Sequence, residues 1–164
     1  PFAVMLADDL IDAETPGIRQ LVDIFAETEE SVIALMKVPR EEVHQYGVIK
    51  GTEVKPRLYA VEGTVEKPAA KEAPSQLAII GRYVLRPEIF SILQNLPPGR
   101  GGEIQLTDGL ARLVQERKIF GCEFTGDRYD IGDKFAFVRA TVAYALKRKD
   151  LRDKLIEYLK SLKN

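Results

Sequence analysis

Apolar, β-branched runs alternate with amphipathic helical segments along this chain. The clearest strand patterns cover 31–38 and 77–85, and a helical pattern that opens at Pro16 and Gly17 precedes the first of them. Gly81 interrupts the second run, which predicts a bulge or a close approach by another backbone or a ligand. Strands that alternate with helices are typical of layered α/β proteins. The sequence therefore predicts an α/β fold.

The first residues form an apolar run without alternation. Residues 1–7 (PFAVMLA) are all apolar, and Asp8 and Asp9 follow directly. Such a run is typical of a strand that is buried on both faces in the middle of a parallel sheet. A strand of that kind needs neighbours on both sides, so we expect an N-terminal segment of the fold to be missing. An edge strand that begins here is the alternative, and the residue pattern does not decide between the two.

Length and composition describe an ordinary globular chain. The 164 residues suit one domain or a large part of one, and 30% of them are charged. The net charge of −1 gives no reason to expect nucleic acid or a membrane surface as a partner. No apolar run approaches the ~20 residues that a membrane-crossing helix needs. The chain has a single cysteine, Cys122, which favours a reducing, cytoplasmic location. Cys122 lies in an apolar run, which predicts that its small side chain is buried.

Two groups of carboxylates follow predicted strands. Asp8 comes after the first run, and Asp130 ends a short β-like run before Gly132 and a helix that starts near Lys134. Open α/β sheets bind ligands at the C-terminal ends of their strands, and Mg²⁺ prefers oxygen ligands. If the two strand ends are adjacent, Asp8 and Asp130 can share one ion. The plainer interpretation is a solvated turn at Asp8 and a helix cap at Asp133.

An acid and a base stand side by side at the end of the strand predicted over 58–66. Pro68 follows Lys67 and favours an extended Lys67, with Glu66 and Lys67 on opposite faces. A glutamate there can accept hydrogen bonds from sugar hydroxyls, and a lysine can bind a phosphate as a point charge. A surface ion pair is the more ordinary interpretation of these two residues.

Three other features are less specific. The glycines of 98–103 can present N–H groups to an anion, but the stretch lacks the ending of a P-loop, and a flexible loop explains it equally well. Glu103 can contact a hydroxyl or begin the helix predicted over 104–117. His44, the single histidine, excludes a multi-histidine zinc site and is most simply an exposed residue. The helical pattern over 134–162 predicts a break near Asp150, which can cap a second helix.

Several short motifs, taken in order, resemble one family. They are ADDLI (7–11), YGV (46–48), VEKP (65–68), PS with LA (74–75 and 77–78), GRYVL (81–85), GGEIQLTD (101–108) and YDIGDK (129–134). This series resembles the bacterial UTP–glucose-1-phosphate uridylyltransferases, also called UDP-glucose pyrophosphorylases, over essentially the whole chain. Each motif is weak alone, and their order makes the resemblance specific.

The resemblance implies a Rossmann-like nucleotidyltransferase fold with a mixed sheet, incomplete at the N-terminus. It implies a catalytic part over 1–133, with the sugar and metal sites, and a C-terminal helical segment over 134–164. Mg²⁺ is the implied cofactor, held by Asp8 and Asp130. By similarity, the catalytic residues are Lys67, Asp8 and Asp130. The implied substrate-binding residues are Gly47, Glu66, Lys67, Gly81 and Glu103, with Glu66 on sugar hydroxyls and Lys67 on the sugar phosphate.

The implied reaction joins UTP and glucose 1-phosphate to give UDP-glucose and pyrophosphate. The resemblance also implies a cytoplasmic homo-oligomer without nucleic-acid or membrane partners. One departure is large, because the family carries a glycine-rich, basic loop near its N-terminus and nothing of that kind precedes Asp8. We therefore expect the C-terminal part of such an enzyme, inactive by itself. The alternatives are another sugar-1-phosphate nucleotidyltransferase, for example one that uses dTTP, and a non-catalytic sugar-nucleotide-binding domain.

Overall fold

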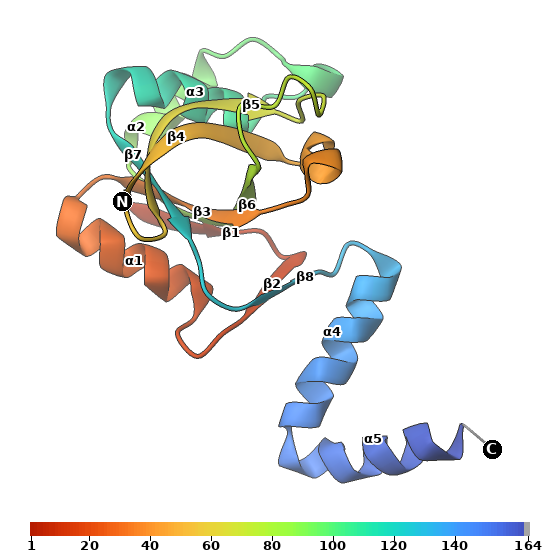
Figure 1. Cartoon of the computed structure of the whole chain (residues 1–164). Helices are drawn as coiled ribbons and strands as arrows, with labels where there is room; N and C mark the ends of the chain where they lie inside the picture. Colours follow the sequence, from red (N-terminus) through yellow and green to blue (C-terminus); the bar gives the residue numbers. More distant parts are fainter. Residues whose placement is uncertain (163–164) are drawn as a thin grey trace. The chain divides into compact units, whose positions relative to one another are not determined.

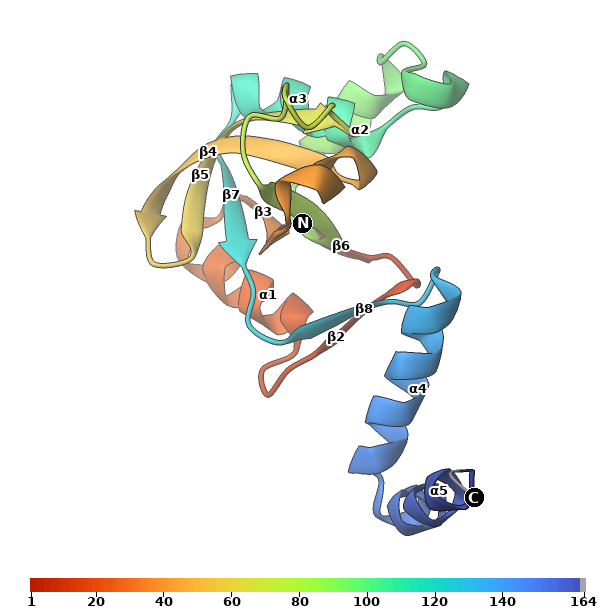
Figure 2. The same cartoon turned by 45° about the vertical axis from the view of Figure 1, so that its right-hand side comes forward.

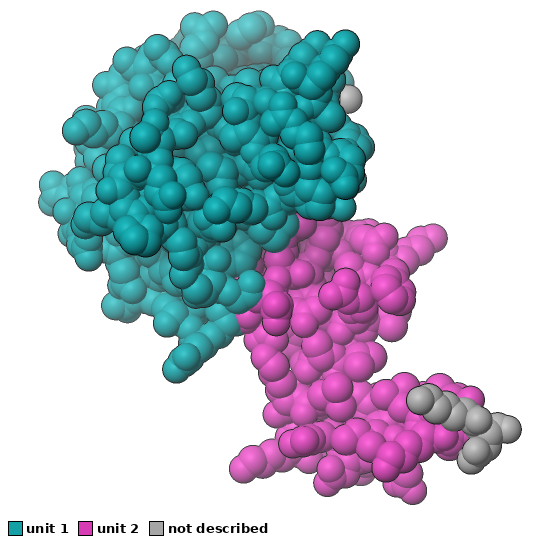
Figure 3. Space-filling model, in the orientation of Figure 1, with its two compact units in different colours: residues 1–6, 13–126 teal, residues 7–12, 127–164 magenta. Residues whose placement is uncertain are grey.

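The chain folds into two compact units. The structure is a computed structural model that describes residues 1–162, apart from the side chain of Arg100. Unit 1 comprises residues 1–6 and 13–126, and unit 2 comprises residues 7–12 and the chain from 127 onward (Figure 3). The catalytic part predicted over 1–133 and the helical segment predicted over 134–164 are functional divisions, and they stay predictions.

Unit 1 is built on a mixed sheet. Its strands are β1 (Phe2–Met5), β3 (Ser31–Lys37), β4 (Gly47–Lys55), β5 (Leu58–Glu66), β6 (Leu77–Leu85) and β7 (Ile119–Glu123). Their order is β1-β6-β3-β7-β5-β4, with β3 and β7 parallel and the other neighbours antiparallel. Val48 of β4 also pairs with Ala78 of β6, so the sheet curls (Figure 1). The predicted α/β fold with a mixed sheet is confirmed.

Helices pack against both sides of this sheet (Figures 1 and 2). They are α1 (Gly17–Thr28), α2 (Glu88–Gln94) and α3 (Leu106–Glu116), with short 3₁₀ turns at Arg40–Gln45 and Arg100–Gly102. α1 packs on β3 and β6, whereas α3 packs on β5 and α2. The core between α3 and the sheet includes Ile33, Leu35, Leu110 and Leu113, all nearly inaccessible to solvent. This core holds the start of α3 next to the end of β5.

The first strand differs from the prediction. β1 lies at the edge of the sheet, antiparallel to β6, and its residues alternate in burial, with Met5 60% exposed. The expected parallel pairing is therefore wrong for the neighbour that the structure shows, and a second neighbour of β1 stays a prediction. An apolar run is ambiguous here, because an antiparallel edge strand can leave apolar side chains in solvent on one face. The Phe2 ring stacks on Phe90 of α2, with centroids 4.8 Å apart.

Unit 2 is a two-stranded ribbon followed by two helices. Its elements are β2 (Asp9–Asp12), β8 (Asp127–Asp130), α4 (Lys134–Lys147) and α5 (Lys149–Ser161). The carboxylate of Asp133 accepts a hydrogen bond of 2.8 Å from the N–H of Ala136 and caps α4. The helix cap predicted at Asp133 is confirmed. The predicted break is confirmed, but Arg148 precedes α5 and the predicted Asp150 cap is wrong. Asp150 lies in the first turn, where it binds Arg148.

Among residues 1–162, none of the helices has both the length and the apolar character to cross a bilayer.

Candidate functional site

One group of predicted site residues lies where β4 begins and β5 ends. Gly47 and Glu66 stand directly opposite each other in the antiparallel pair. The N–H of Lys67 donates to the carbonyl oxygen of Tyr46 at 2.9 Å, which continues the pairing by one bond beyond β5. The β4–β5 hairpin therefore brings Gly47 next to Glu66 and Lys67. Their positions in the sequence alone do not place them together.

Thr107, in the first turn of α3, completes this group. A Cβ atom added to Gly47 would lie 2.7 Å from Oγ1 of Thr107 and 3.2 Å from Oε2 of Glu66. Glycine at this position therefore permits a close approach of β4 to the hydroxyl and the carboxylate. Reasoning from the sequence missed Thr107 as a site residue, although it lies within the motif GGEIQLTD. Gly47, Glu66, Lys67 and Thr107 are called the hairpin site below.

The backbone of Lys67 differs from the prediction. Lys67 has a φ of +44°, so it is left-handed, and the expectation of an extended residue facing away from Glu66 is wrong. Its Nζ lies 3.8 Å from Oε1 of Glu66. A non-glycine residue in this region costs on the order of 1–3 kcal/mol, which the surrounding structure must offset. The Glu66 side chain is 14% exposed and that of Lys67 46%, so a mostly covered carboxylate stands beside an ammonium that reaches solvent.

Gly81 and Glu103 lie elsewhere in unit 1. The pairing of β3 with β6 slips beside Gly81, which confirms the predicted bulge, and the Gly81 carbonyl accepts the N–H of Leu6 at 2.9 Å. Glu103 follows the second 3₁₀ turn, where its side chain is exposed and its carbonyl accepts the N–H of Gly99 at 2.8 Å. A contact of either residue with a sugar stays a prediction.

The second group lies in unit 2, at the turn that joins β8 to α4. The N–H of Ile131 donates to the carbonyl oxygen of Asp8 at 2.7 Å. A Cβ atom added to Gly132 would lie 3.2 Å from Oδ1 of Asp130 and 3.7 Å from Oδ2 of Asp8. The two predicted metal-binding carboxylates therefore converge on one turn, because the β2–β8 pairing places Asp9 opposite Asp130.

Arg128 links the acids of this group. Its Nε lies 2.5 Å from Oδ1 of Asp9, and its Nη2 lies 3.1 Å from Oδ2 of Asp130. The side chains of Arg128 and Asp9 are about as buried as core residues, at 10% and 8% exposure. Reasoning from the sequence missed Arg128. The available signal was strand alternation, which puts the side chains of residues 128 and 130 on one face of β8.

The chemistry of the two carboxylates fits a divalent cation completed by other ligands. Within residues 1–162, no three or more His, Cys, Asp or Glu side chains are grouped so that they can hold a metal. Asp8 and Asp130 offer carboxylate oxygens, and Arg128 engages one oxygen of Asp130. Mg²⁺ is usually bound through one or two carboxylates, with water and substrate phosphates as its remaining ligands. The pair suits such an ion.

His44 and Cys122 take the plainer roles predicted for them. His44 is exposed, and its Nδ1 lies 2.6 Å from the carbonyl oxygen of Glu41. Cys122 is 5% exposed, and burial raises the pKa of its thiol to about 11. A thiol with that pKa is almost entirely protonated at neutral pH, so Cys122 is a poor nucleophile.

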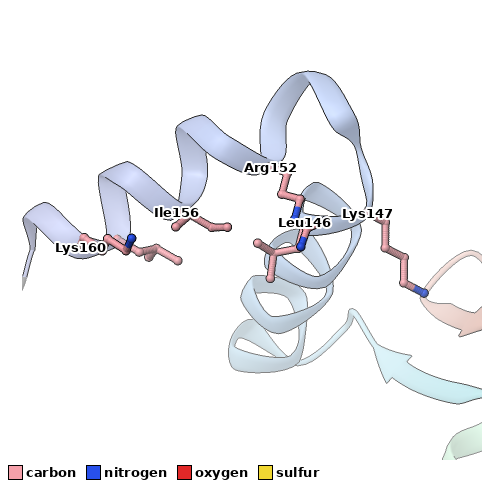
Figure 4. A pocket seen from close by; sticks show the side chains of 6 residues that line it. Leu146, Lys147, Arg152, Ile156 and Lys160 are labelled. Atoms are coloured by element: carbon pink, nitrogen blue, oxygen red, sulfur yellow. The ribbon is translucent and has the colours of Figure 1, made fainter.

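An open hollow of about 740 Å³ lies between α4 and α5 in unit 2 (Figure 4). It is lined by Leu146, Lys147, Arg152, Ile156, Leu159 and Lys160. The lining combines aliphatic and cationic side chains, and it includes none of the predicted site residues.

Comparison with known proteins places this chain in one family. A family model described as nucleotidyl transferase matches residues 1–147. The chain belongs to the nucleotidyl transferase family. Among nucleotidyl transferases, a UTP–glucose-1-phosphate uridylyltransferase of Bacillus subtilis (strain 168) is 47% identical over 164 residues, which are 100% of this chain and 56% of that protein.

Solved structures of nucleotidyl transferases agree with this relationship. A UDP-glucose pyrophosphorylase complexed with UDP-glucose superposes with a TM-score of 0.84 and 42% identity, over 90% of this chain and 57% of that chain. A UTP-bound UGPase from Acinetobacter baumannii gives a TM-score of 0.85 and 30% identity, over 98% of this chain and 56% of that chain. The family resemblance inferred from the motifs is confirmed, and the chain spans little more than half the length of these relatives.

Proposed function

We propose that this chain carries the sugar-phosphate and metal sites of a UTP–glucose-1-phosphate uridylyltransferase. The chain matches 56% of the Bacillus subtilis relative, so the activity of the whole protein is itself part of the proposal. The observation that carries it is the hairpin site, where Glu66 and Lys67 stand side by side across from Gly47. A phosphorylated sugar presents hydroxyls and a phosphate close together, which this pair can bind.

The hairpin site divides the recognition of glucose 1-phosphate between two side chains. The Glu66 carboxylate accepts hydrogen bonds from sugar hydroxyls, and its partial burial strengthens those bonds. The Lys67 ammonium binds the phosphate. Gly47 allows the start of β4 to lie close to Thr107 and Glu66, since any side chain at residue 47 would meet the Thr107 hydroxyl.

The proposed reaction needs positioning and charge neutralisation more than proton transfer. A phosphate oxygen of glucose 1-phosphate attacks the α-phosphorus of UTP, the bond to the β-phosphate breaks, and pyrophosphate leaves as UDP-glucose forms. The attacking oxygen is already ionised, so no side chain has to remove a proton. Lys67 orients the attacking phosphate and offsets its charge. Asp8 and Asp130 would hold Mg²⁺, which when bound stabilises negative charge on the phosphates.

The role of Lys67 is tested by titrating glucose 1-phosphate into the 164-residue chain in a calorimeter. The Lys67→Ala variant should bind at least about tenfold more weakly, because it loses a charge-assisted hydrogen bond. Lys71→Ala is the matched control, since Lys71 is an exposed lysine of the loop that follows. Absence of binding by the wild-type chain contradicts the proposed function. Equal affinities of wild type and Lys67→Ala contradict the assignment of Lys67 alone.

The metal site is tested with Mn²⁺, a paramagnetic substitute for Mg²⁺ that broadens nearby NMR signals. The amide signals of Ile131 and Gly132 should broaden in the wild-type chain and stay sharp in Asp130→Asn. Asp127→Asn is the matched control, because Asp127 is an exposed aspartate at the other end of β8. Broadening that survives Asp130→Asn unchanged would show that Asp130 is not a ligand.

A homo-oligomer in the cytoplasm is the remaining part of the proposal. Apolar side chains stay exposed along α4 and α5, among them Phe135 at 71%, Phe137 at 54% and Tyr158 at 59%. Exposed apolar surface of this kind often marks a contact between proteins. The single buried cysteine suits a reducing compartment. Sedimentation velocity of the chain at several concentrations tests the association, and a monomer at every concentration contradicts it.

A further inference from the structure

Thr64 is a buried polar residue on the same strand as Glu66. It is 9% exposed, whereas Val65, the residue between them, is 45% exposed. Strand alternation puts the side chains of residues 64 and 66 on one face of β5. Thr64 therefore points to the side of the sheet on which α3 packs.

The Thr64 hydroxyl ties β5 to the start of α3. Oγ1 of Thr64 donates a hydrogen bond of 2.6 Å to the carbonyl oxygen of Thr107. The side chain of the same Thr107 approaches the space between Gly47 and Glu66. One hydrogen bond thus connects the strand that carries Glu66 to the residue that faces Glu66 across the hairpin site.

Lys67 is held by a different contact. Its N–H donates to the carbonyl oxygen of Tyr46, at the other edge of the hairpin. The two recognition groups of the hairpin site therefore have separate supports: Thr64 and Thr107 for the surroundings of Glu66, and Tyr46 for the backbone of Lys67. A change at Thr64 should affect the binding of sugar hydroxyls more than the binding of phosphate.

We propose that Thr64 is a positioning residue that sets the geometry of Glu66 for sugar recognition through the carbonyl of Thr107. The inference rests on the proposed function, because it assigns Glu66 to the sugar. The Thr64–Thr107 bond keeps the start of α3 at a defined distance from β5. That distance sets where the Thr107 side chain lies beside Gly47 and the Glu66 carboxylate, the group that binds the sugar hydroxyls in the proposed function.

The test uses Thr64→Val, which keeps the shape of the side chain and removes the donor. The affinity for glucose 1-phosphate should fall about five- to tenfold, as expected for the loss of one buried hydrogen bond. The affinity for inorganic phosphate should stay unchanged, and Thr64→Ser should restore the affinity for glucose 1-phosphate. Thr52→Val is the matched control, because the exposed Thr52 hydroxyl donates to Glu62 on the same hairpin at 2.7 Å.

Two outcomes would overturn the role of Thr64 and leave the proposed function standing. One is an unchanged affinity of Thr64→Val for glucose 1-phosphate. The other is an equal loss of affinity for glucose 1-phosphate and for inorganic phosphate, which indicates a general structural defect. Absence of glucose 1-phosphate binding by the wild-type chain instead contradicts the proposed function.

A ligand-free measurement tests the positioning separately. The carboxyl ¹³C signal of Glu66 and the amide signal of Gly47 should shift in Thr64→Val and stay in place in Thr52→Val. If neither signal moves in Thr64→Val, the positioning role is wrong whether or not the chain binds a sugar phosphate.

Discussion

The two compact units hold their candidate sites by different means. Unit 1 has a continuous apolar core, in which Ile33, Leu110 and Leu113 are almost fully buried. In unit 2, among residues 7–12 and 127–162, Asp9 and Ala140 are the buried residues. The hairpin site is thus fixed by sheet pairing over a core, whereas the acidic pair of Asp8 and Asp130 depends mainly on a short ribbon.

Ion pairs take the place of an apolar core in unit 2. Arg128 binds Asp9 and Asp130, and Lys147 of α4 binds Asp12 of β2. The bond to Asp12 is the main cause that raises the pKa of Lys147. Exposed pairs such as the one made by Lys147 are weakened by salt, whereas burial of apolar side chains is not. Two sites on one short chain thus differ in what disrupts them.

Truncation of the core of unit 1 should have the largest effect on stability. Leu110→Ala should lower the free energy of unfolding by about 3 kcal/mol, because it removes a fully buried side chain and leaves a cavity. Urea denaturation followed by circular dichroism measures the loss. The matched variant is Leu159→Ala in α5, where the residue is 39% exposed and the expected loss is below about 0.5 kcal/mol. Equal losses of unfolding free energy in the two variants would contradict the inference that only unit 1 depends on an apolar core.

Removal of Arg128 should have the next largest effect, confined to unit 2. Arg128→Met should destabilise the β2–β8 ribbon by about 2 kcal/mol, because Asp9 would be left buried without its guanidinium partner. Faster hydrogen exchange of the Leu10 and Tyr129 amides measures this change. Arg148→Met is the control, since the side chains of Arg148 and its partner Asp150 are 65% and 63% exposed, and no change in exchange is expected. An unaltered ribbon in Arg128→Met would show that the ion pairs do not hold unit 2.

Cys122 gives the smallest effect at neutral pH, and it reports on burial in unit 1. The pKa of its thiol is raised from 9.0 to about 11, mainly by burial. Well below pH 9 the thiol is almost entirely protonated in both the folded and the unfolded chain, so stability is nearly unaffected. Between pH 9 and 11 the unfolded chain loses the proton first, and stability should fall with rising pH. Cys122→Ser should lack this part of the pH dependence; an identical profile in both proteins would contradict it.

The same burial predicts slow alkylation of Cys122. At pH 8 the folded chain should react with iodoacetamide far more slowly than the chain in guanidinium chloride, because only the thiolate reacts. Mass spectrometry of timed samples measures the two rates. Equal rates would mean that the end of β7 opens readily in the folded state.

Local pattern was sufficient to predict most elements of this fold. The β-branched runs predicted strands that the structure has at Ser31–Lys37 and Leu77–Leu85, and the Pro-Gly pair predicted the helix at Gly17–Thr28. Patterns failed where one local signal fits two environments. The opening apolar run fits parallel and antiparallel pairing equally, and the structure pairs β1 with β6 in an antiparallel arrangement. Pro68 favours an extended Lys67, but the bond to Tyr46 holds a left-handed turn.

By itself, then, the sequence determined the alternation of strands and helices, the family, and which acids, glycines and lysine to consider as site residues. These are properties of residue type and spacing along the chain. Only the tertiary structure decided that Gly47 faces Glu66, that Thr107 closes the hairpin site, and that Arg128 joins Asp9 to Asp130. Such contacts join residues far apart in the chain, and they depend on strand register and helix packing, which periodicity alone does not specify.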